Sequence, residues 1–372
     1  MISLVFLIAP LATARYALAI PLPRNDGLGI HLVFLNLILL VIISSLGAVI
    51  LLLFGKAIFS YLNYSELESY IWIIIVGNIL IALNDIMANW STRKKTFNLL
   101  SKTRVLQTFF AQIIKISLGL AGFKPGGLLI GGVVQNGAGG LILLTRFILE
   151  CKKSISRFHL GRILFLAKYY YRFPLLNLPA QLLQVLSVKL PILYFAYQFG
   201  QDTTGQLGLA ISVIAIPVGV FGISTGKAYY GEISEIGNKK GEDILQITSD
   251  FIKKISLMAI FPAMLLLVFA PVIFPYIFGA GWYDAGKFTS VLSIYLFFQF
   301  VSLPLTNIYN VFNKQNVLLK LNALRFMLIS CVFLISFQTG TDAYQTLLFY
   351  SLVLSLFYVI NIVHALNILR KI

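Results

Sequence analysis

The sequence contains few charged residues, few cysteines and few histidines, and each shortage excludes a class of protein. Only 11% of its 372 residues are charged, whereas about a quarter is usual in a soluble domain. Such a composition excludes a secreted domain, a coiled coil and a disordered tail. The two cysteines, Cys151 and Cys331, lie far apart and predict neither a disulfide framework nor a metal site. The histidines are scattered, at His31, His159 and His364, so no metal or other cofactor is expected.

Motifs for catalysis are also missing. The closest approach to a phosphate-binding loop is Gly222-Ile-Ser-Thr-Gly226-Lys227-Ala228, which has one residue too few between its glycines and an alanine in place of the magnesium-binding hydroxyl. Neither a D-x-D pair nor an H-E-x-x-H motif occurs. No histidine is expected near a buried carboxylate, as a nucleophilic triad would need. The sequence therefore predicts no catalytic residue and favours transport, driven by an ion gradient or by substrate supply, over enzymatic chemistry.

Apolar residues are abundant and arranged in long runs. They make up 59% of the chain, and the mean hydropathy is +0.89. A helix needs about 20 apolar residues to cross a bilayer, and the runs between glycines, prolines and charge clusters predict about eleven such helices. We therefore expect an all-α polytopic membrane protein. Its helices are expected over residues 2–14, 28–54, 67–90, 100–121, 125–149, 173–198, 204–228, 251–279, 286–311, 316–337 and 342–368.

The net charge of +16 arises from 29 Lys and Arg residues against 13 acids. A nucleic-acid partner would need a basic face with base-reading or stacking groups outside the lipid, and we expect none. Lys and Arg instead mark the cytoplasmic side of a membrane protein, and a cytoplasmic carboxyl terminus places nearly all of them there, including Arg325 at a helix flank. Only Lys56, Lys124 and Lys287 fall on the opposite side, and Lys115 and Lys189 fall within spans.

The predicted spans divide into two groups. An amino-terminal lobe of five helices is expected over residues 1–149 and a carboxy-terminal lobe of six over residues 173–372. The basic connection 150–172 is interpreted either as a helix lying on the anionic inner leaflet or as an ordinary cytoplasmic loop. Eleven spans would place Met1 outside with no signal sequence to take it there, so one helix is expected to be missing from the start.

Polar residues recur on single faces of two predicted helices. Ionisable side chains at membrane depth are costly and usually face a bundle interior or a hydrated cavity. On the third helix, Asn78, Asp85 and Asn89 share one face, which continues to Arg93. The fourth carries polar and small residues at steps of three or four: Arg104, Thr108, Gln112, Lys115 and Gly119.

These two stripes allow two interpretations. In the first, they line a hydrated cavity in which Lys115 and Arg104 meet anionic groups and Asp85 serves as a counter-ion or proton site. In the second, Asp85 forms a structural pair with Lys115 or with Arg93 that only holds helices together. A stripe of five positions is more than one pair needs, which favours the cavity.

Two further spans carry weaker signals. In the sixth, Pro191 either breaks the helix at a binding site or leaves Lys189 to extend toward the interface. In the fifth, the glycine-rich stretch from Gly126 to Gly140 carries small residues at four-residue spacing, which predicts close helix packing rather than substrate contact.

Four sequence motifs occur in order along the chain. They are Ala14-Arg15-Tyr16-Ala17-Leu18-Ala19-Ile20-Pro21-Leu22-Pro23, the WSTRKKTF segment from Trp90 to Phe97, Tyr171-Arg172-Phe173-Pro174, and Phe278-Gly279-Ala280-Gly281-Trp282-Tyr283-Asp284-Ala285-Gly286. In this order and spacing, and over nearly its whole length, the chain resembles the polysaccharide-biosynthesis or Wzx-type O-antigen flippases of the multidrug/oligosaccharidyl-lipid/polysaccharide exporter superfamily.

The resemblance implies a MATE-like fold of two six-helix lobes that open alternately to either side of the membrane. It implies movement of an undecaprenyl-pyrophosphate-linked oligosaccharide from the inner to the outer leaflet of a bacterial plasma membrane, with membrane lipids and other polysaccharide-assembly proteins as partners. The family ordinarily has twelve helices or more, so this chain is expected to begin at the second. The residues expected to bind cargo are Arg104 and Lys115, then Lys189 and Gln112 in the cavity, and Arg15 and Arg24 at its cytoplasmic mouth.

Two other functions remain open. A multidrug or small-molecule exporter of the same superfamily would be expected to carry several buried carboxylates, and Asp85 is the one found. A membrane-embedded polysaccharide polymerase would be expected to present a large outer loop with polar catalytic groups, whereas the outer loops here are short. Either protons or sodium ions could drive transport.

Overall fold

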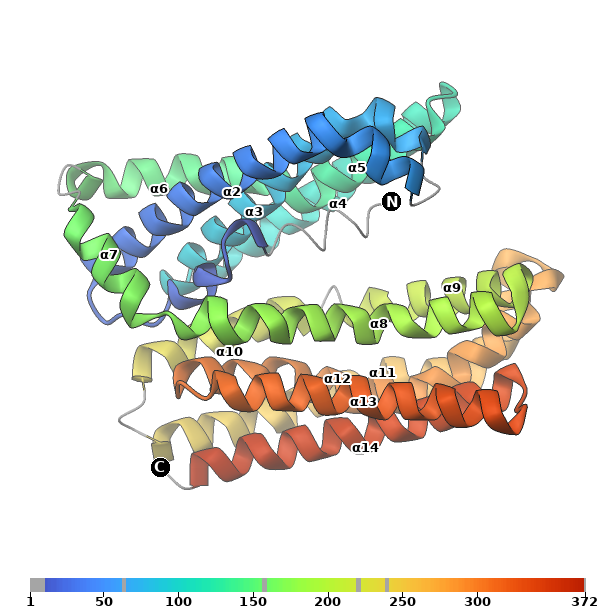
Figure 1. Ribbon diagram of the computed structural model, residues 1–372. Coiled ribbons are helices and arrows are strands. Elements are labelled where there is room, and N and C mark those ends of the chain that lie inside the picture. The colour runs from blue at the N-terminus through green and yellow to red at the C-terminus, as the bar shows by residue number, and fades with distance from the viewer. Residues whose placement is uncertain (1–10, 62–64, 156–158, 219–221, 238–240, 371–372) are drawn as a thin grey trace. The chain divides into compact units, whose positions relative to one another are not determined.

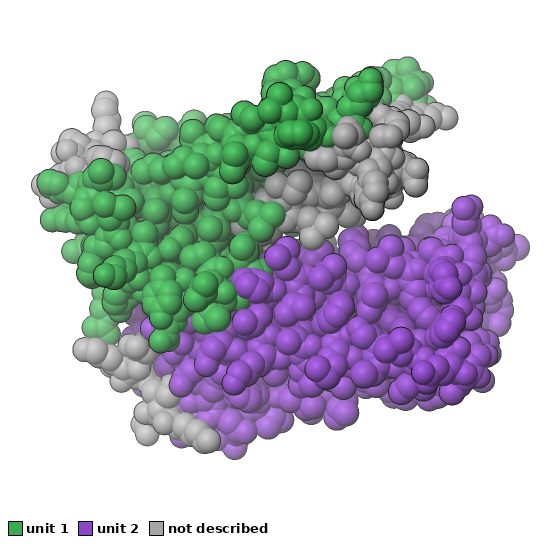
Figure 2. All heavy atoms as spheres, in the orientation of Figure 1, with its two compact units in different colours: residues 1–178 green, residues 179–372 purple. Residues whose placement is uncertain are grey.

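The computed structural model describes residues 11–61, 65–155, 159–218, 222–237 and 241–370. All regular structure in these ranges is helical, and none of it is a strand (Figure 1). The predicted all-α class is therefore confirmed. The helices form two compact units, residues 1–178 and 179–372, which Figure 2 shows in separate colours.

Unit 1 contains six α-helices and several shorter helical turns among its described residues. The α-helices are α2 (Asp26–Tyr61), α3 (Ile71–Arg93), α4 (Phe97–Leu120), α5 (Lys124–Gly137), α6 (Gly139–Ile155) and α7 (Leu160–Tyr169). The turns are η1 (Tyr16–Ala19), η2 (Ser65–Tyr70) and η3 (Phe173–Asn177).

Unit 2 contains seven α-helices and one short turn among its described residues. They are α8 (Leu178–Gln198), α9 (Gly200–Pro217), α10 (Ile223–Ile236), α11 (Gly241–Phe278), η6 (Ala280–Trp282), α12 (Tyr283–Val311), α13 (Gln315–Thr339) and α14 (Ala343–Arg370). Helix α12 lies at the centre, packed against α9, α10, α11 and α14. Figure 1 shows α12, α13 and α14 running side by side.

Eight helical segments are long and apolar enough to cross a membrane, by length and composition, within the described residues. The eleven predicted spans differ from these eight at three places. Residues 2–10 of the first span lie outside the described residues. Span 100–121 is α4, a helix of 24 residues whose polar stripe lowers its hydropathy. Span 204–228 covers most of α9 and the start of α10, and residues 219–221 between these helices lie outside the described residues.

Three other helix predictions differ from the structure in detail. The fifth predicted helix, 125–149, is interrupted at Ala138, so that α5 and α6 replace one helix. The predicted connection 150–172 holds the end of α6 and all of α7, which packs against α2 within unit 1. Helix α8 continues through Pro191, so the alternative in which that proline breaks the helix is wrong.

Glycines set the distance between the helices of unit 1. A methyl group at Gly140 would lie 2.7 Å from the backbone nitrogen of Asn84 in α3, and one at Gly137 would lie 2.8 Å from Cβ of Leu80. These contacts leave no room for a side chain, because real Cβ atoms do not approach so closely. The predicted packing role of this glycine stripe is confirmed.

Arg93, the last residue of α3, holds the loop that precedes α2. Its guanidinium donates hydrogen bonds to the carbonyl oxygens of Ile20, at 3.3 Å, and of Pro23, and it pairs with Oδ1 of Asp26 at 3.0 Å. Gly29 leaves space for this side chain, since a methyl group there would lie 2.7 Å from Nε of Arg93. A charged donor that satisfies buried carbonyl groups stabilises such a loop.

In unit 2, buried polar contacts connect α12 to α14. The hydroxyl of Tyr309 donates to Oδ1 of Asn361 at 2.7 Å, and the amide of Asn361 donates to the hydroxyl of Ser302 at 2.7 Å. Ser351 donates to the carbonyl oxygen of Val291 at 2.7 Å. Interhelical hydrogen bonds of this kind add to packing where water is absent.

The glycine contacts predict a large difference between two alanine substitutions. Gly140→Ala places a methyl group against the backbone of α3, which cannot rotate away, and should destabilise the protein by about 1–3 kcal/mol. Gly47→Ala in α2 meets no atom within 4 Å and should be neutral or stabilising by up to about 1 kcal/mol. Thermal unfolding of both variants in detergent measures the difference, and equal melting temperatures would contradict the packing role.

Candidate functional site

The candidate site is built around Asp85 on α3. Asn89, one turn later, donates its amide to Oδ1 of Asp85 at 3.2 Å and to the backbone carbonyl of Asp85 at 2.8 Å. Asn78 lies on the same face, buried, and its Oδ1 has no hydrogen-bond partner in the described part of the chain. On the predicted polar face of this helix, Asn78 and Asn89 are thus buried and Asp85 is half-buried.

Arg15 lies within the electrostatic field of Asp85. Burial lowers the pKa of Arg15, and the carboxylate of Asp85 acts in the opposite direction and raises it. The backbone of Arg15 is left-handed, with φ of 63°, directly before the turn η1. Arg15 is half-buried at this turn, and its predicted place at the mouth of the cavity stays a prediction.

Lys115 contacts the neighbouring helix α5 rather than Asp85. Its ammonium donates a hydrogen bond to Oε1 of Gln135 at 2.6 Å. The aliphatic stem of Lys115 lies against Gly131, where a methyl group would be 2.3 Å from Cγ of the lysine. A glycine at this position therefore makes room for a cation between α4 and α5.

The two structural pairs that the sequence offered as an alternative are both wrong. Within the described ranges, Arg93 forms its salt bridge with Asp26, and Lys115 bonds to Gln135. The sequence could not reveal this because helical spacing fixes the face of a residue but not the helix that lies opposite.

The other predicted site residues lie in different surroundings. Arg104 is half-buried on α4, whereas Gln112 is exposed on the same helix. Arg24 is exposed in the loop before α2, and Lys189 is half-buried on α8 in unit 2. The structure thus brings Asp85 and Arg15 into one neighbourhood, leaves Gln112 and Arg24 on the surface, and places Lys189 in the second unit.

Arg325 is a buried cation that the sequence analysis misplaced. It was expected at a cytoplasmic flank, but it lies ten residues into α13, about 15 Å along the helix at 1.5 Å per residue. Only 5% of the residue is exposed, and its guanidinium carbon is 5.5 Å from the centre of the Tyr358 ring on α14. The rings of Tyr295 and Tyr350 complete an aromatic cluster.

No carboxylate forms a salt bridge with Arg325 in the ranges that the structure describes, and its Nε has no hydrogen-bond partner there. The sequence did contain a signal that Arg325 is buried: it lies about ten residues inside an expected span, further in than the flank of a helix extends. An arginine at this depth is costly and marks a functional position by default. Among the described residues, no group of three or more His, Cys, Asp or Glu side chains could hold a metal ion.

Because Asp85 acts on Arg15, we expect the effects of substituting these two residues on stability to be non-additive. Asp85→Asn removes the negative charge that favours the half-buried guanidinium of Arg15, and Arg15→Gln removes the positive charge in the field of Asp85, so each should lower the melting temperature in detergent. The double variant should lose less than the sum of the two, with a coupling of about 0.5–3 kcal/mol. Arg24→Gln, an exposed cation, is the matched control and should have little effect. Strict additivity would show that Asp85 and Arg15 act independently.

Comparison with known proteins identifies both the family and the fold of this chain. The family model described as polysaccharide biosynthesis protein matches residues 33–287. No curated protein matches the chain. Solved structures similar to it are transporters, and each match extends over nearly the whole of this chain.

A MATE structure in complex with MaD3S has a TM-score of 0.79 at 14% identity, covering 100% of this chain and 86% of that one. The Vibrio cholerae MATE transporter VcmN in its bent form has a TM-score of 0.77 at 15% identity, with the same coverage. A multidrug resistance MATE family transporter of the MOP superfamily, in an outward-facing conformation, has a TM-score of 0.76 at 13% identity and covers 99% and 84%. The helical bundle described above is thus a MATE-like fold, and the chain belongs to the polysaccharide biosynthesis protein family.

Proposed function

We propose that this protein is a flippase for lipid-linked oligosaccharide. It moves a polyprenyl-diphosphate-linked repeat unit from the inner to the outer leaflet of a bacterial plasma membrane, for O-antigen, capsule or another surface polysaccharide. Its carboxyl terminus lies in the cytoplasm, as the Lys and Arg distribution favours. Its partners are the lipid-linked oligosaccharide, membrane lipids and other polysaccharide-assembly proteins of the membrane.

The family match is the observation that carries the proposal. A model for polysaccharide biosynthesis proteins covers residues 33–287, across parts of both units. The MATE-like fold supports a mechanism of alternating access, because two compact helical units can bind a cargo and expose it to one side at a time. A polysaccharide-biosynthesis protein with this fold is best explained as the transporter that carries the glycan precursor across the membrane.

The charges inside the bundle favour an anionic cargo. Arg325 in unit 2 is a buried cation, and Arg15 and Lys115 in unit 1 are half-buried. Asp85 is the acid on the polar face of α3. Burying cations without matching carboxylates is costly unless an anion completes the site. The diphosphate and acidic sugars of a lipid-linked glycan supply such an anion, while the lipid tail stays in the bilayer.

Asp85 is our candidate for coupling to a proton or sodium gradient. The carboxylate of Asp85 accepts a hydrogen bond from Asn89 and lies in the electrostatic field of Arg15. Protonation of Asp85, or binding of a sodium ion to it, would therefore remove a negative charge that favours the charged form of Arg15. No cofactor is needed for this mechanism, since each step consists of binding and conformational change.

A multidrug exporter is the second candidate function, because one of the similar structures is a multidrug resistance transporter. Exporters of cationic drugs are expected to bind them through buried carboxylates. The interior cations described above would repel such a cargo. An enzyme, such as a polysaccharide polymerase, is disfavoured by the connections α8–α9, α11–α12 and α13–α14, which are between one and four residues long.

Deleting the gene should cause lipid-linked repeat units to accumulate on the cytoplasmic leaflet. The wild-type gene should restore surface glycan, and Arg325→Met should not, because it removes the buried charge and keeps an apolar side chain of similar length. Arg162→Met, at an exposed cation on α7, is the matched control and should restore glycan. Immunoblots of membranes check that each variant is present.

Two outcomes of this experiment would argue against the proposal. Unpolymerised units on the outer surface of the deletion strain would indicate a polymerase. Drug sensitivity with normal surface glycan would indicate a multidrug exporter. If Arg325→Met restores glycan fully, the cation on α13 has no part in binding cargo, although the flippase function itself would stand.

A further inference from the structure

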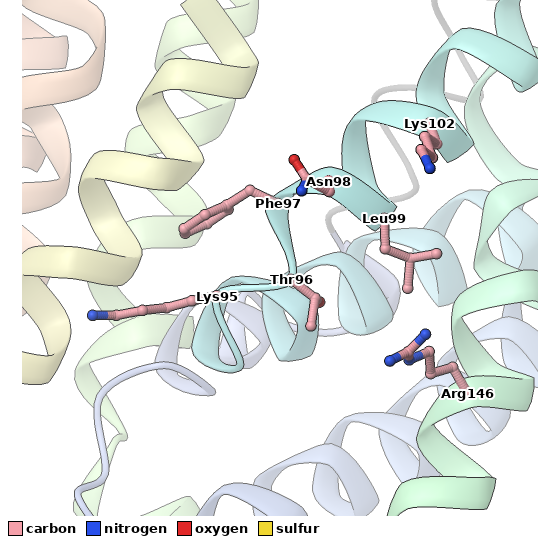
Figure 3. A pocket seen from close by; sticks show the side chains of 7 residues that line it. All are labelled: Lys95, Thr96, Phe97, Asn98, Leu99, Lys102 and Arg146. Carbon is pink, nitrogen blue, oxygen red and sulfur yellow. The ribbon is translucent and has the colours of Figure 1, made fainter.

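A basic pocket lies at the turn between α3 and α4, outside the polar face that carries Asp85. Its volume is about 470 Å³, and it is lined by Lys95, Thr96, Phe97, Asn98, Leu99, Lys102 and Arg146. The turn is tight, because the backbone of Lys95 is left-handed with φ of 55°. Figure 3 shows that Lys102 of α4 and Arg146 of α6 lie on the same side of the turn as Leu99, whereas Lys95 extends away from them.

On the side of the pocket where Lys102 and Arg146 lie, away from Lys95, the charge is close to that needed for a single anion. Lys102 and Arg146 each contribute one positive charge, and Arg146 is paired through Nε with Oε1 of Glu150 at 2.8 Å. The pair leaves about one positive charge uncompensated. The first turn of α4, from Phe97 to Leu99, also lines the pocket, and the amino-terminal end of a helix favours anions.

Apolar side chains continue from the pocket toward the middle of the helices. On α4, Leu106, Phe109 and Ile113 follow Lys102 on one helical face, and all three are exposed. On α6, Ile142 is exposed one turn before Arg146. Lys102 and Arg146 fall on the side that the charge distribution assigns to the cytoplasm. The cationic pocket is thus continuous with an apolar surface along α4 and α6.

We propose that this pocket binds the phosphodiester head group of an anionic phospholipid of the cytoplasmic leaflet. Lys102 and Arg146 contact the phosphate, and the acyl chains lie along the apolar stripe of α4 and beside Ile142 of α6. Basic pockets between membrane helices on the cytoplasmic side commonly bind such head groups. A phosphodiester carries one negative charge, which matches the side of the pocket formed by Lys102 and Arg146.

The site is independent of the flippase proposal, since the lipid is a resident molecule and not the cargo. Native mass spectrometry of the detergent-purified full chain tests it, with separate titrations of phosphatidylglycerol, phosphatidylcholine, undecaprenyl diphosphate and inorganic phosphate. We expect the wild-type protein to retain phosphatidylglycerol in preference to the other three. Lys102→Gln with Arg146→Gln should weaken that binding about tenfold or more, as loss of charge-assisted contacts predicts.

Two further variants make the test specific. Arg162→Gln with Lys168→Gln removes two exposed cations from α7 of the same unit and should leave phosphatidylglycerol binding unchanged. Glu150→Gln removes the one acid that neutralises Arg146, so it should tighten binding. All variants should elute as the wild type does in size-exclusion chromatography, because the substituted side chains are exposed.

Each contrary result overturns the assignment. Equal loss of lipid in the α7 control would show that overall charge, and not the pocket, attracts the lipid. Binding of inorganic phosphate as tight as that of phosphatidylglycerol would show that no lipid is recognised. A preference for undecaprenyl diphosphate that depends on Lys102 and Arg146 would assign the pocket to the cargo instead.

Discussion

Close contact of α5 and α6 with the neighbouring helices α3 and α4 determines where the polar groups of unit 1 can lie. Gly137 and Gly140 bring the backbone of α3 near, and Gly131 provides the space in which Lys115 crosses to α5. The same approach lets the amide of Asn84 reach the carbonyl oxygen of Asn136 at 2.9 Å. Without these glycines the helices would stand further apart, and the polar side chains would have to find partners in lipid, where none exist.

Burial of cations is the second constraint. In unit 1, these cations have specific hydrogen-bonding or ion-pair partners. Arg93 contacts Asp26 and three loop carbonyl groups, and Lys115 contacts Gln135. In unit 2, Arg325 lies against aromatic rings and forms no salt bridge among the described residues. Arg93 and Lys115 thus stabilise contacts within unit 1, whereas the burial of Arg325 without a salt bridge costs free energy. A protein that binds an anionic cargo has a reason to retain such a group.

Composition and periodicity were enough to predict the helical membrane class, most of the helices and the polar face of α3. The four motifs pointed to the family that the match over residues 33–287 shows. Pairing between helices could not be predicted, because the spacing of Asp85 and Lys115 fixes a helical face and says nothing about which helix packs against it. Arg325 was misplaced for a related reason: the rule that assigns Lys and Arg to the cytoplasm does not recognise a cation buried in an aromatic cluster. The interruption at Ala138 was also missed, since the hydropathy of the segment continues through it.

The central claim is that the protein moves a lipid-linked glycan across the bilayer. Its most direct test is reconstitution of the full chain into vesicles that carry a fluorescent polyprenyl-diphosphate oligosaccharide, with a membrane-impermeant quencher added outside. The account predicts that inner-leaflet probe reaches the quencher much faster than in protein-free vesicles, whereas a zwitterionic phospholipid probe does not. Equal rates with and without protein under proton and sodium gradients, combined with accumulation of a cationic dye, would contradict the account and identify a drug exporter.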